Sequence, residues 1–288
     1  MSITSSFTGL AMAALVLSGC GGPTEATQDG AVTLKFNVAP GNKFTYAAES
    51  TQHIDAPGQK IDQSITMVSS YAVQAGAGTS KNLTVSYDRV AMKMETMGQK
   101  LAYDSSDPST SSSPLATMGR LVGKSFEIVL TDKGKVTSIK GVDALLDSMV
   151  DPANPNAVAM RAQLSKSMND STLRSSTEQA FNIYPSNPVK PGDTWSTTTS
   201  LAMGVLSMRV ASTYKLNSVR NGRAYLGVTS KMTGQGAMDM NGTQTGTLEV
   251  ETATGMLADS KIAQTLTSKA GAPTAKIVTN IHITGTKK

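Results

Sequence analysis

Apolar and polar residues alternate along most of the chain, and clusters of Gly, Pro, Asn and Asp interrupt the alternation. A period of two places neighbouring side chains on opposite faces of a strand, so each stretch predicts a half-buried β-strand. Short turns join successive stretches, which favours antiparallel pairing. The expected early strands start near Val32, Phe44, Ile61 and Leu83, and later strands run from Trp195 onward, with turns at Asn221-Gly222, Asn241-Gly242, Thr254-Gly255 and Gly271-Ala272-Pro273.

Helical spacing replaces this alternation between about residues 114 and 181. Ser113 fits an N-cap, and Pro114 fits the first helical position after it. Residues 157–181 predict a longer helix that Asn169 breaks or recaps. A β-hairpin is expected around residues 126–139. A further helix is predicted by the apolar positions Val142, Leu145, Leu146 and Met149.

The two strand-rich regions resemble each other. We interpret this as an internal duplication, with chance similarity of two meanders as the alternative. The predicted fold is mainly β (α+β): an antiparallel curved sheet or half-barrel of about ten strands, built from two similar meanders, with the helical insert covering the concave face. The matching segments are Pro40–Phe44 with Pro191–Trp195, Tyr71–Tyr87 with Tyr214–Val228, Met94–Gly98 with Met238–Gly242, and Phe126–Val136 with Leu248–Leu257.

The only cysteine, Cys20, follows Leu17-Ser18-Gly19 and an apolar run that starts at Leu10. This pattern indicates a lipoprotein signal peptide that is cleaved between Gly19 and Cys20, after which Cys20 is lipidated. The apolar run is shorter than the ~20 residues that cross a bilayer. No Lys or Arg precedes it, unlike a usual signal peptide, so a wrong start at Met1 or a core helix with a chance cysteine are alternatives.

These features divide the chain into three parts. Residues 1–19 are the expected signal peptide and residues 20–31 the lipidated cysteine with a flexible tether. Residues 32–288 are expected to form one β-rich domain, with a first meander over 32–105, a helical insert with a β-hairpin over 106–186 and a second meander over 187–288. We expect a lipid-anchored protein of the cell envelope, on the outer membrane facing the periplasm if the host is Gram-negative.

Composition narrows the possible functions. Charged residues make up 16% of the chain and aromatic residues 5%, and the formal net charge of +5 is not concentrated in a basic cluster. Nucleic-acid binding needs a basic stripe interleaved with aromatics, so we expect no nucleic-acid partner. With one cysteine, no disulfide can form within the chain.

No segment carries a catalytic signature. Gly-x-Ser-x-Gly and Ser-x-x-Lys motifs are absent, and glycine-rich stretches lie in hairpins rather than before helices. His53 and His282 lack the spacing of metal ligands. Glu249 and Glu251 share one strand face, which is more typical of a solvated strand than of a glycosidase pair. We therefore expect no enzyme, no cofactor and no metal.

Methionine is unusually frequent, with 16 residues in the chain. Thioethers pack in cores, adapt to varied apolar ligands and bind Cu(I), and all three interpretations remain open here. If a cavity lies between sheet and helices, its expected lining is Met92, Met94, Leu115, Met118, Leu145, Met149, Met160, Leu164, Met238 and Met240.

Two segments, Leu121–Val136 and Asn187–Trp195, are similar to an uncharacterised family of bacterial lipoproteins known only as a domain of unknown function. The resemblance would cover roughly residues 32–286 and includes no catalytic residue. The order of lipobox, meander and helical insert also resembles lipoprotein carriers of the LolA and LppX type. That resemblance implies a half-barrel that holds acyl chains beneath helices, although a shared fold does not fix function.

The expected function is that of a membrane-anchored, non-enzymatic lipoprotein that binds a lipid or other hydrophobic ligand between sheet and helices. A structural envelope lipoprotein that binds another protein is the main alternative, because a filled core with an exposed apolar patch would favour it. Copper binding through methionine is a lesser alternative.

Overall fold

A computed structural model describes residues 30–76, 80–167, 169–203, 206–235, 240–268 and 275–288. Its strands form one antiparallel sheet in the order β6-β5-β3-β2-β1-β12-β11-β10-β9-β8-β7, with β4 paired to β3. The predicted antiparallel fold is confirmed, with twelve strands rather than about ten. The strands are β1 (Lys43–Ala56), β2 (Gln59–Gln74), β3 (Lys81–Thr96), β4 (Gln99–Asp104), β5 (Ser125–Leu130), β6 (Val136–Lys140), β7 (Thr194–Met203), β8 (Leu206–Arg220), β9 (Arg223–Gln235), β10 (Met240–Glu251), β11 (Leu257–Ser268) and β12 (Lys276–Lys287).

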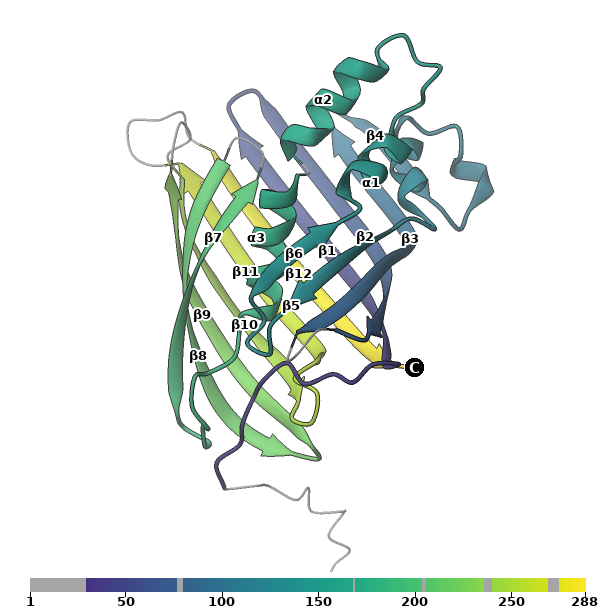
Figure 1. The fold of residues 1–288 in the computed structure, drawn as a ribbon. Coiled ribbons are helices and arrows are strands. Elements are labelled where there is room, and N and C mark those ends of the chain that lie inside the picture. The colour runs from purple at the N-terminus through teal and green to yellow at the C-terminus, as the bar shows by residue number, and fades with distance from the viewer. Residues whose placement is uncertain (1–29, 77–79, 168, 204–205, 236–239, 269–274) are drawn as a thin grey trace, which may run out of the picture.

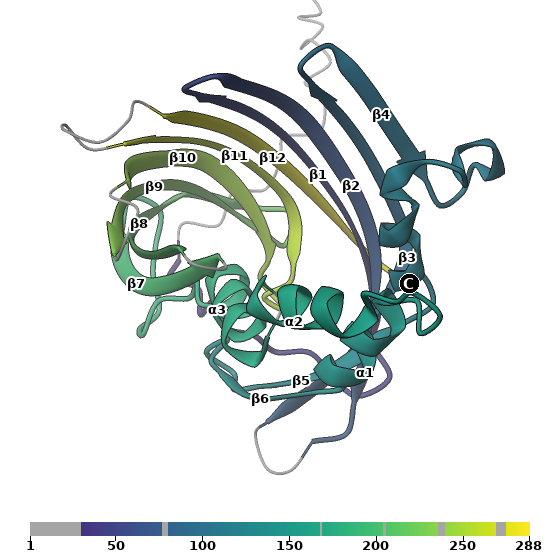
Figure 2. The ribbon, with the colours of Figure 1, turned by 90° about the horizontal axis from the view of Figure 1, so that it is seen from above.

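The sheet curves into a half-barrel, and the helices lie across its open, concave side (Figures 1 and 2). Twist accumulates from strand to strand, so a sheet this wide curls rather than staying flat. The helical insert comprises the 3₁₀ helices η1 (Pro108–Thr110) and η2 (Pro114–Leu121) and the α-helices α1 (Val142–Met149), α2 (Ala157–Ser167) and α3 (Asp170–Phe181).

Local sequence explains where these helices begin. The Ser113 hydroxyl accepts a hydrogen bond from the backbone N–H of Leu115, which confirms the predicted N-cap, although the element is a 3₁₀ helix. Asn169 separates α2 from α3, and its side chain accepts from the N–H of Thr172. The predicted recapping at Asn169 is therefore confirmed.

Equivalent hydrogen bonds support the predicted duplication at the first strand of each half. Gly41 N donates to Val73 O (2.9 Å), and Gly192 N donates to Leu216 O (2.8 Å). Both glycines have positive φ, at 87° and 97°, which an L-residue side chain disfavours. The side chain after each glycine accepts from the backbone three residues earlier, as Ala39 N→Asn42 Oδ1 and Lys190 N→Asp193 Oδ2.

The last hairpin of each half is also equivalent. The β5–β6 register shifts after Val129, and the β10–β11 register shifts after Glu249. Their turns contain Gly134 and Gly255, with φ of 76° and 73°. Strands β1, β2, β3, β5 and β6 thus correspond to β7, β8, β9, β10 and β11, and β12 lies between the two sets in the sheet.

Three predictions from the sequence are wrong, the last of them in part. Residues 32–36 form no strand; the segment is extended, with a single bridge between Val32 and Val189, and it crosses the lower end of the concave side (Figure 1). Asn241-Gly242 is not a turn but lies inside β10. A side chain at position 242 would stand 2.3 Å from the Thr265 carbonyl, so this glycine allows close strand approach. In the predicted match of Met94–Gly98 with Met238–Gly242, Met97 and Gly98 lie in the turn after β3, whereas Asn241 and Gly242 lie inside β10, so this part of the match fails. Met238 and residues 269–274, with the predicted turn at Gly271, lie outside the described residues.

We call residues 31–42 the first strap and residues 182–193 the second strap. Alternate residues of the first strap are buried, and Phe36 is fully buried. Its N–H donates to Asp132 O (2.8 Å) in the β5–β6 turn, while Asn37 N donates to Thr254 O (2.8 Å) in the β10–β11 turn. The first strap therefore ties together the last hairpins of both halves.

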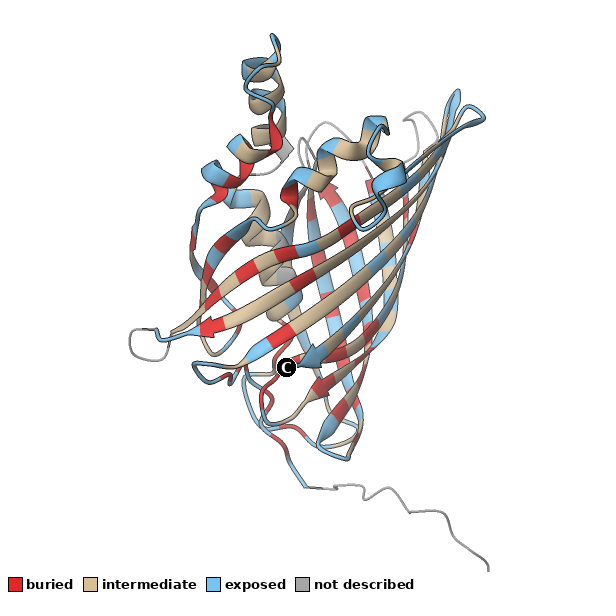
Figure 3. Ribbon diagram, turned by 90° about the vertical axis from the view of Figure 1, so that its right-hand side faces the viewer, coloured by how far each residue is buried: buried red, intermediate tan, exposed pale blue. Residues whose placement is uncertain are grey.

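The main core fills the concave side near the straps. It combines inward-facing strand residues with both straps and with α1, and buried and exposed positions alternate along the strands (Figure 3). A smaller buried cluster lies in the second half of the sheet and contains Met208, Val210, Met232, Met240 and Leu266.

Candidate functional site

Among the described residues of eight neighbouring strands, no charged side chain lies on the inner face of the sheet. Alternation from the buried Phe44, Leu83 and Leu226 identifies the residues that face inward. The described positions are even residues of 44–54, 208–216, 226–234, 240–250 and 260–268, odd residues of 61–73 and 277–285, and 83, 85, 87, 90, 92, 94 and 96 of β3.

The outer face of the same strands carries the charges. His53 Nδ1 and Asp62 Oδ1 lie 2.5 Å apart, and His282 Nε2 and Asp259 Oδ2 lie 2.8 Å apart. Both pairs link neighbouring strands on the outer face. Among the described residues, no three His, Cys, Asp or Glu side chains are placed to hold a metal ion.

A set of inward-facing apolar residues is only partly buried. They lie on β3, β2, β1, β12 and β11, which are consecutive in the sheet. Apolar side chains that face a concave surface without being buried leave that surface able to accept apolar atoms. We call this set the inner apolar patch: Ile54, Ile61, Ile65, Met67, Met92, Met94, Ile262, Ile277, Ile281 and Ile283.

One line of uncharged polar residues crosses the inner face perpendicular to the strands. Gln63 Nε2 donates to Gln52 Oε1 (2.6 Å), and Gln52 Nε2 donates to Thr279 Oγ1 (3.2 Å). Farther along, the hydroxyls of Ser212 and Ser230 are hydrogen-bonded at 2.9 Å. Strand register places eight residues in this line, which we call the polar row: Gln63, Gln52, Thr279, Gln264, Gln244, Ser230, Ser212 and Thr197.

Tyrosines near the straps add no charge to the inner face. Burial raises the pKa of Tyr71 to about 12. Burial also raises the pKa of Tyr46, whose ring meets that of Tyr71 edge to face with centroids 5.1 Å apart. These phenols remain neutral at physiological pH, so the inner face stays uncharged.

The expected cavity residues are distributed over different environments. Met92 and Met94 face inward from β3 and belong to the inner apolar patch, whereas Met240 is buried on β10. Five strand spacings, about 24 Å along the sheet, separate β3 from β10, so these methionines are not neighbours along it. Met238 lies outside the described residues, as do Gly19 and Cys20.

Most of the helical residues that were expected to line a cavity pack in or against the main core instead. In α1, Leu145 and Met149 are buried. The side chains of Leu115, Met118, Met160 and Leu164 are partly buried, and Met118 and Leu164 pack against the main core.

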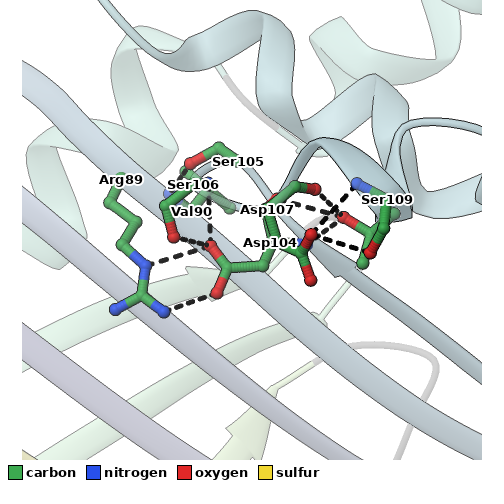
Figure 4. Close-up of polar contacts among 8 residues, drawn as sticks. Arg89, Val90, Asp104, Ser105, Ser106, Asp107 and Ser109 are labelled. Carbon is green, nitrogen blue, oxygen red and sulfur yellow. Dashed lines mark hydrogen bonds and ion pairs between the residues drawn. The ribbon is translucent and has the colours of Figure 1, made fainter.

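An ion pair positions the segment that leads from β4 to η2. Arg89 Nε donates to Asp104 Oδ1 (3.0 Å), and Arg89 Nη2 donates to Asp104 Oδ2 (2.5 Å) (Figure 4). Asp104 also accepts from Ser106 N and Oγ, and these interactions hold the pKa of its carboxyl below the usual range. Farther on, Gly119 of η2 packs so closely on Tyr103 that a Cβ would meet the phenol oxygen. These two contacts therefore fix where the segment between β4 and η2 passes onto the inner side of the sheet.

Helix α3 lies between the two edge strands, β6 and β7, and contacts both. Arg174 Nη1 donates to Val136 O (2.6 Å), and Glu178 Oε1 accepts from Val136 N (3.1 Å). The two side chains satisfy backbone groups that an edge strand would otherwise expose. Helix α3 thus covers the opening of the half-barrel at this level.

The sequence predicts a ligand cavity between the sheet and the helices. Four hollows among the described residues lie elsewhere, because strands and hairpin tips line them. One of about 610 Å³ lies along the β12-β1-β2-β3-β4 side, and its lining includes His53 and Asp62 of the outer face. Another lies between the β1–β2 and β3–β4 hairpin tips. The other two have linings that include outward-facing residues of β9 to β12 and β1.

The polar row was not foreseen from the sequence. Each of its glutamines occupies an inward position of an alternating stretch, which was the available signal. Only the register of the strands shows that residues as distant in sequence as Gln52 and Gln264 share one level of the sheet.

The fold defines an antiparallel half-barrel whose open side is covered by helices, and the described inner-face residues of β1 to β3 and β8 to β12 are uncharged. Residues 78–257 match the model of a family described as a family of unknown function, DUF6263. Because the match spans more than half of the chain, the protein belongs to this family. The matched segment contains both Leu121–Val136 and Asn187–Trp195, the segments that resemble a domain of unknown function.

Among solved structures, the chain is similar to one that describes lipid–protein interactions in lipovitellin, with a TM-score of 0.50 and 8% identity over 86% of this chain. The chain spans only 25% of that lipovitellin chain, so the likeness concerns the fold of one part. Pseudomonas aeruginosa OccK5 (OpdH) and OccK9 (OpdG) align over 86% of this chain and 98% of their own, at 7% and 8% identity, with TM-scores of 0.24 and 0.20. No curated protein matches the sequence. Within the described residues, none of the helices has the length and apolar character required to span a bilayer.

Proposed function

We propose that this protein is a lipoprotein, anchored to a membrane of the cell envelope through Cys20, that binds a lipid or other hydrophobic ligand on the inner face of its sheet without catalysing a reaction. The observation that carries the proposal is the inner apolar patch. Its side chains face the concave side yet stay partly exposed, whereas equivalent positions nearer the straps are buried.

Energetics favour an apolar ligand. Covering about 300 Å² of apolar surface would contribute about 7 kcal/mol before the cost of association is subtracted. The neighbouring polar row is uncharged, so a ligand would not bury an unpaired ion against it. The likeness to part of lipovitellin, a protein whose structure describes lipid–protein interactions, supports the same ligand class.

The test is native mass spectrometry of protein purified without detergent from its own host. We expect a co-purifying lipid. Ile281→Asn places an amide within the patch and should reduce ligand occupancy at least about threefold, because the buried amide must lose water. Val278→Asn, on the outer face of the same strand, is the matched control and should leave occupancy unchanged. Ligand-free protein that also fails to take up lipid from vesicles would refute the proposal.

A second candidate is a structural envelope lipoprotein that binds another protein. The exposed Val158 on α2, 86% accessible, and Met97, 83% accessible at the β3–β4 tip, favour it. If Val158→Ser abolishes capture of an envelope protein by cross-linking while lipid uptake from vesicles is absent, this candidate replaces the first.

A further inference from the structure

The polar row lies between two apolar levels of the inner face. Toward the hairpin tips, the adjacent inward residues include Ile54, Ile61 and Ile277; toward the straps, they include Ile65, Ile281 and Ile262. Inward residues two positions apart on a strand are separated by about 7 Å. Uncharged hydrogen-bonding groups therefore form a narrow band with apolar surface on both sides.

The polar row can both donate and accept hydrogen bonds. A glutamine amide offers one carbonyl acceptor and two N–H donors, and Gln52, Gln63, Gln264 and Gln244 supply four amides on neighbouring or near-neighbouring strands. These four side chains are partly exposed, so they are accessible to a ligand. The Ser and Thr members, by contrast, are largely buried at Ser212, Ser230 and Thr279.

The lack of inner-face charge restricts the ligand further. A carboxylate or phosphate placed against this surface would lose hydration without gaining an Arg or Lys partner. An ester or amide group would lose little, because the glutamines replace its water hydrogen bonds.

We propose that the inner face selects an uncharged lipid in which an ester or amide linkage lies between two hydrocarbon portions. The linkage hydrogen-bonds to the glutamines of the polar row, and the hydrocarbon portions lie on the apolar levels on either side. This inference rests on the proposed function, because it names the ligand class of the same surface.

The experiment compares three labelled probes of equal chain length: an alkane, a wax ester with a central ester group, and a fatty acid at pH 8. Each is presented in phosphatidylcholine vesicles to the full-length Cys20→Ala chain, and its transfer to protein is measured after the vesicles are removed. With its inner face unchanged, the Cys20→Ala chain should take up more of the wax ester than of the alkane or the fatty acid.

The double variant Gln52→Met with Gln264→Met keeps side-chain length but removes two amides. It should lower ester transfer about threefold to tenfold relative to alkane transfer. Asn280→Met, on the outer face beside Thr279, is the control and should leave the ratio unchanged.

Two failures are distinguishable. The inference is wrong if the alkane and the ester both transfer but the ratio of ester to alkane transfer is unchanged in the double variant. It is also wrong if the fatty acid transfers as well as the ester. In both cases the proposed function stands. If no probe transfers to the chain, the proposed function itself is refuted.

Discussion

Phe36 and Phe181 pack edge to face, with ring centroids 5.2 Å apart and ring planes at 70°. Phe36 belongs to the first strap, and Phe181 ends α3 immediately before the second strap. The contact joins the segments that lead into the two halves of the sheet, and it lies in the main core.

Replacing Phe36 should therefore destabilise the whole domain. Phe36 is fully buried, so Phe36→Ala removes apolar contacts and leaves a cavity, at a cost of about 3–5 kcal/mol. Urea denaturation monitored by circular dichroism measures the loss. Lys35→Ala, at an exposed neighbouring position, is the control and should change the free energy of unfolding by less than about 0.5 kcal/mol. If both variants lower the free energy of unfolding equally, the first strap does not stabilise the domain through Phe36.

Gly255 should tolerate a side chain less well than Gly222. Both have positive φ, 73° and 71°, so alanine strains the backbone at either position by about 1–2 kcal/mol. A Cβ at position 255 would also stand 2.1 Å from the Lys35 carbonyl, whereas position 222 is open. Thermal denaturation of Gly255→Ala and Gly222→Ala separates the two effects, and similar losses would show that the strap can move aside.

The Arg89–Asp104 pair should make stability depend on acid pH. Hydrogen bonds from Arg89 lower the folded-state pKa of Asp104, so this stabilisation is complete above the unfolded-state pKa near 4 and is lost as the pH falls toward the lower folded value. Asp104→Asn should lower the free energy of unfolding by about 1 kcal/mol at pH 7, because the pair is partly exposed. The difference from wild type should shrink below pH 4 in urea titrations; a constant difference down to pH 2 would argue against it.

Glu178 should protect the β6 edge. Glu178→Ala leaves the N–H of Val136 without its carboxylate acceptor, so hydrogen exchange at that amide should accelerate about tenfold. Glu178→Gln retains a carbonyl acceptor and should exchange more slowly than the alanine variant. Unchanged exchange in both variants would mean that another group shields this edge.

Cys20 should determine where the protein is found. Lipidation adds about 0.8 kcal/mol of membrane affinity per buried methylene, so Cys20→Ala should move the protein from the membrane fraction to the soluble fraction. Immunoblotting of fractionated cells measures the change. A membrane fraction that is unaffected by the substitution would refute the anchor.

Local features of the fold were predictable, and long-range ones were not. The cap at Ser113, the helix break at Asn169 and the hairpin turn at Asn221-Gly222 follow from neighbouring residues, and the structure contains all three. The first strap resembles a strand because alternate residues are buried, yet it crosses strand ends instead of pairing along one strand. Asn241-Gly242 has the composition of a turn, but glycine there serves strand packing. In both cases, the partner that decides the outcome is distant in sequence.

The candidate site shows the same limit. Alternation along a strand shows that Met92 and Met94 share one face, and the structure places both on the concave side, where the expected cavity lining would lie. The alignment of Gln52 with Thr279 depends on pairing between β1 and β12, which no local pattern specifies.

The place of β12 has a consequence for how the chain folds. Residues 276–287 supply the strand that joins the two halves, and β1 pairs with it along almost its whole length. A ribosome must therefore have synthesised residues 43–287 before the middle of the sheet can close. Because contacts so distant in sequence slow folding, closure of the sheet between its two halves should be a late step.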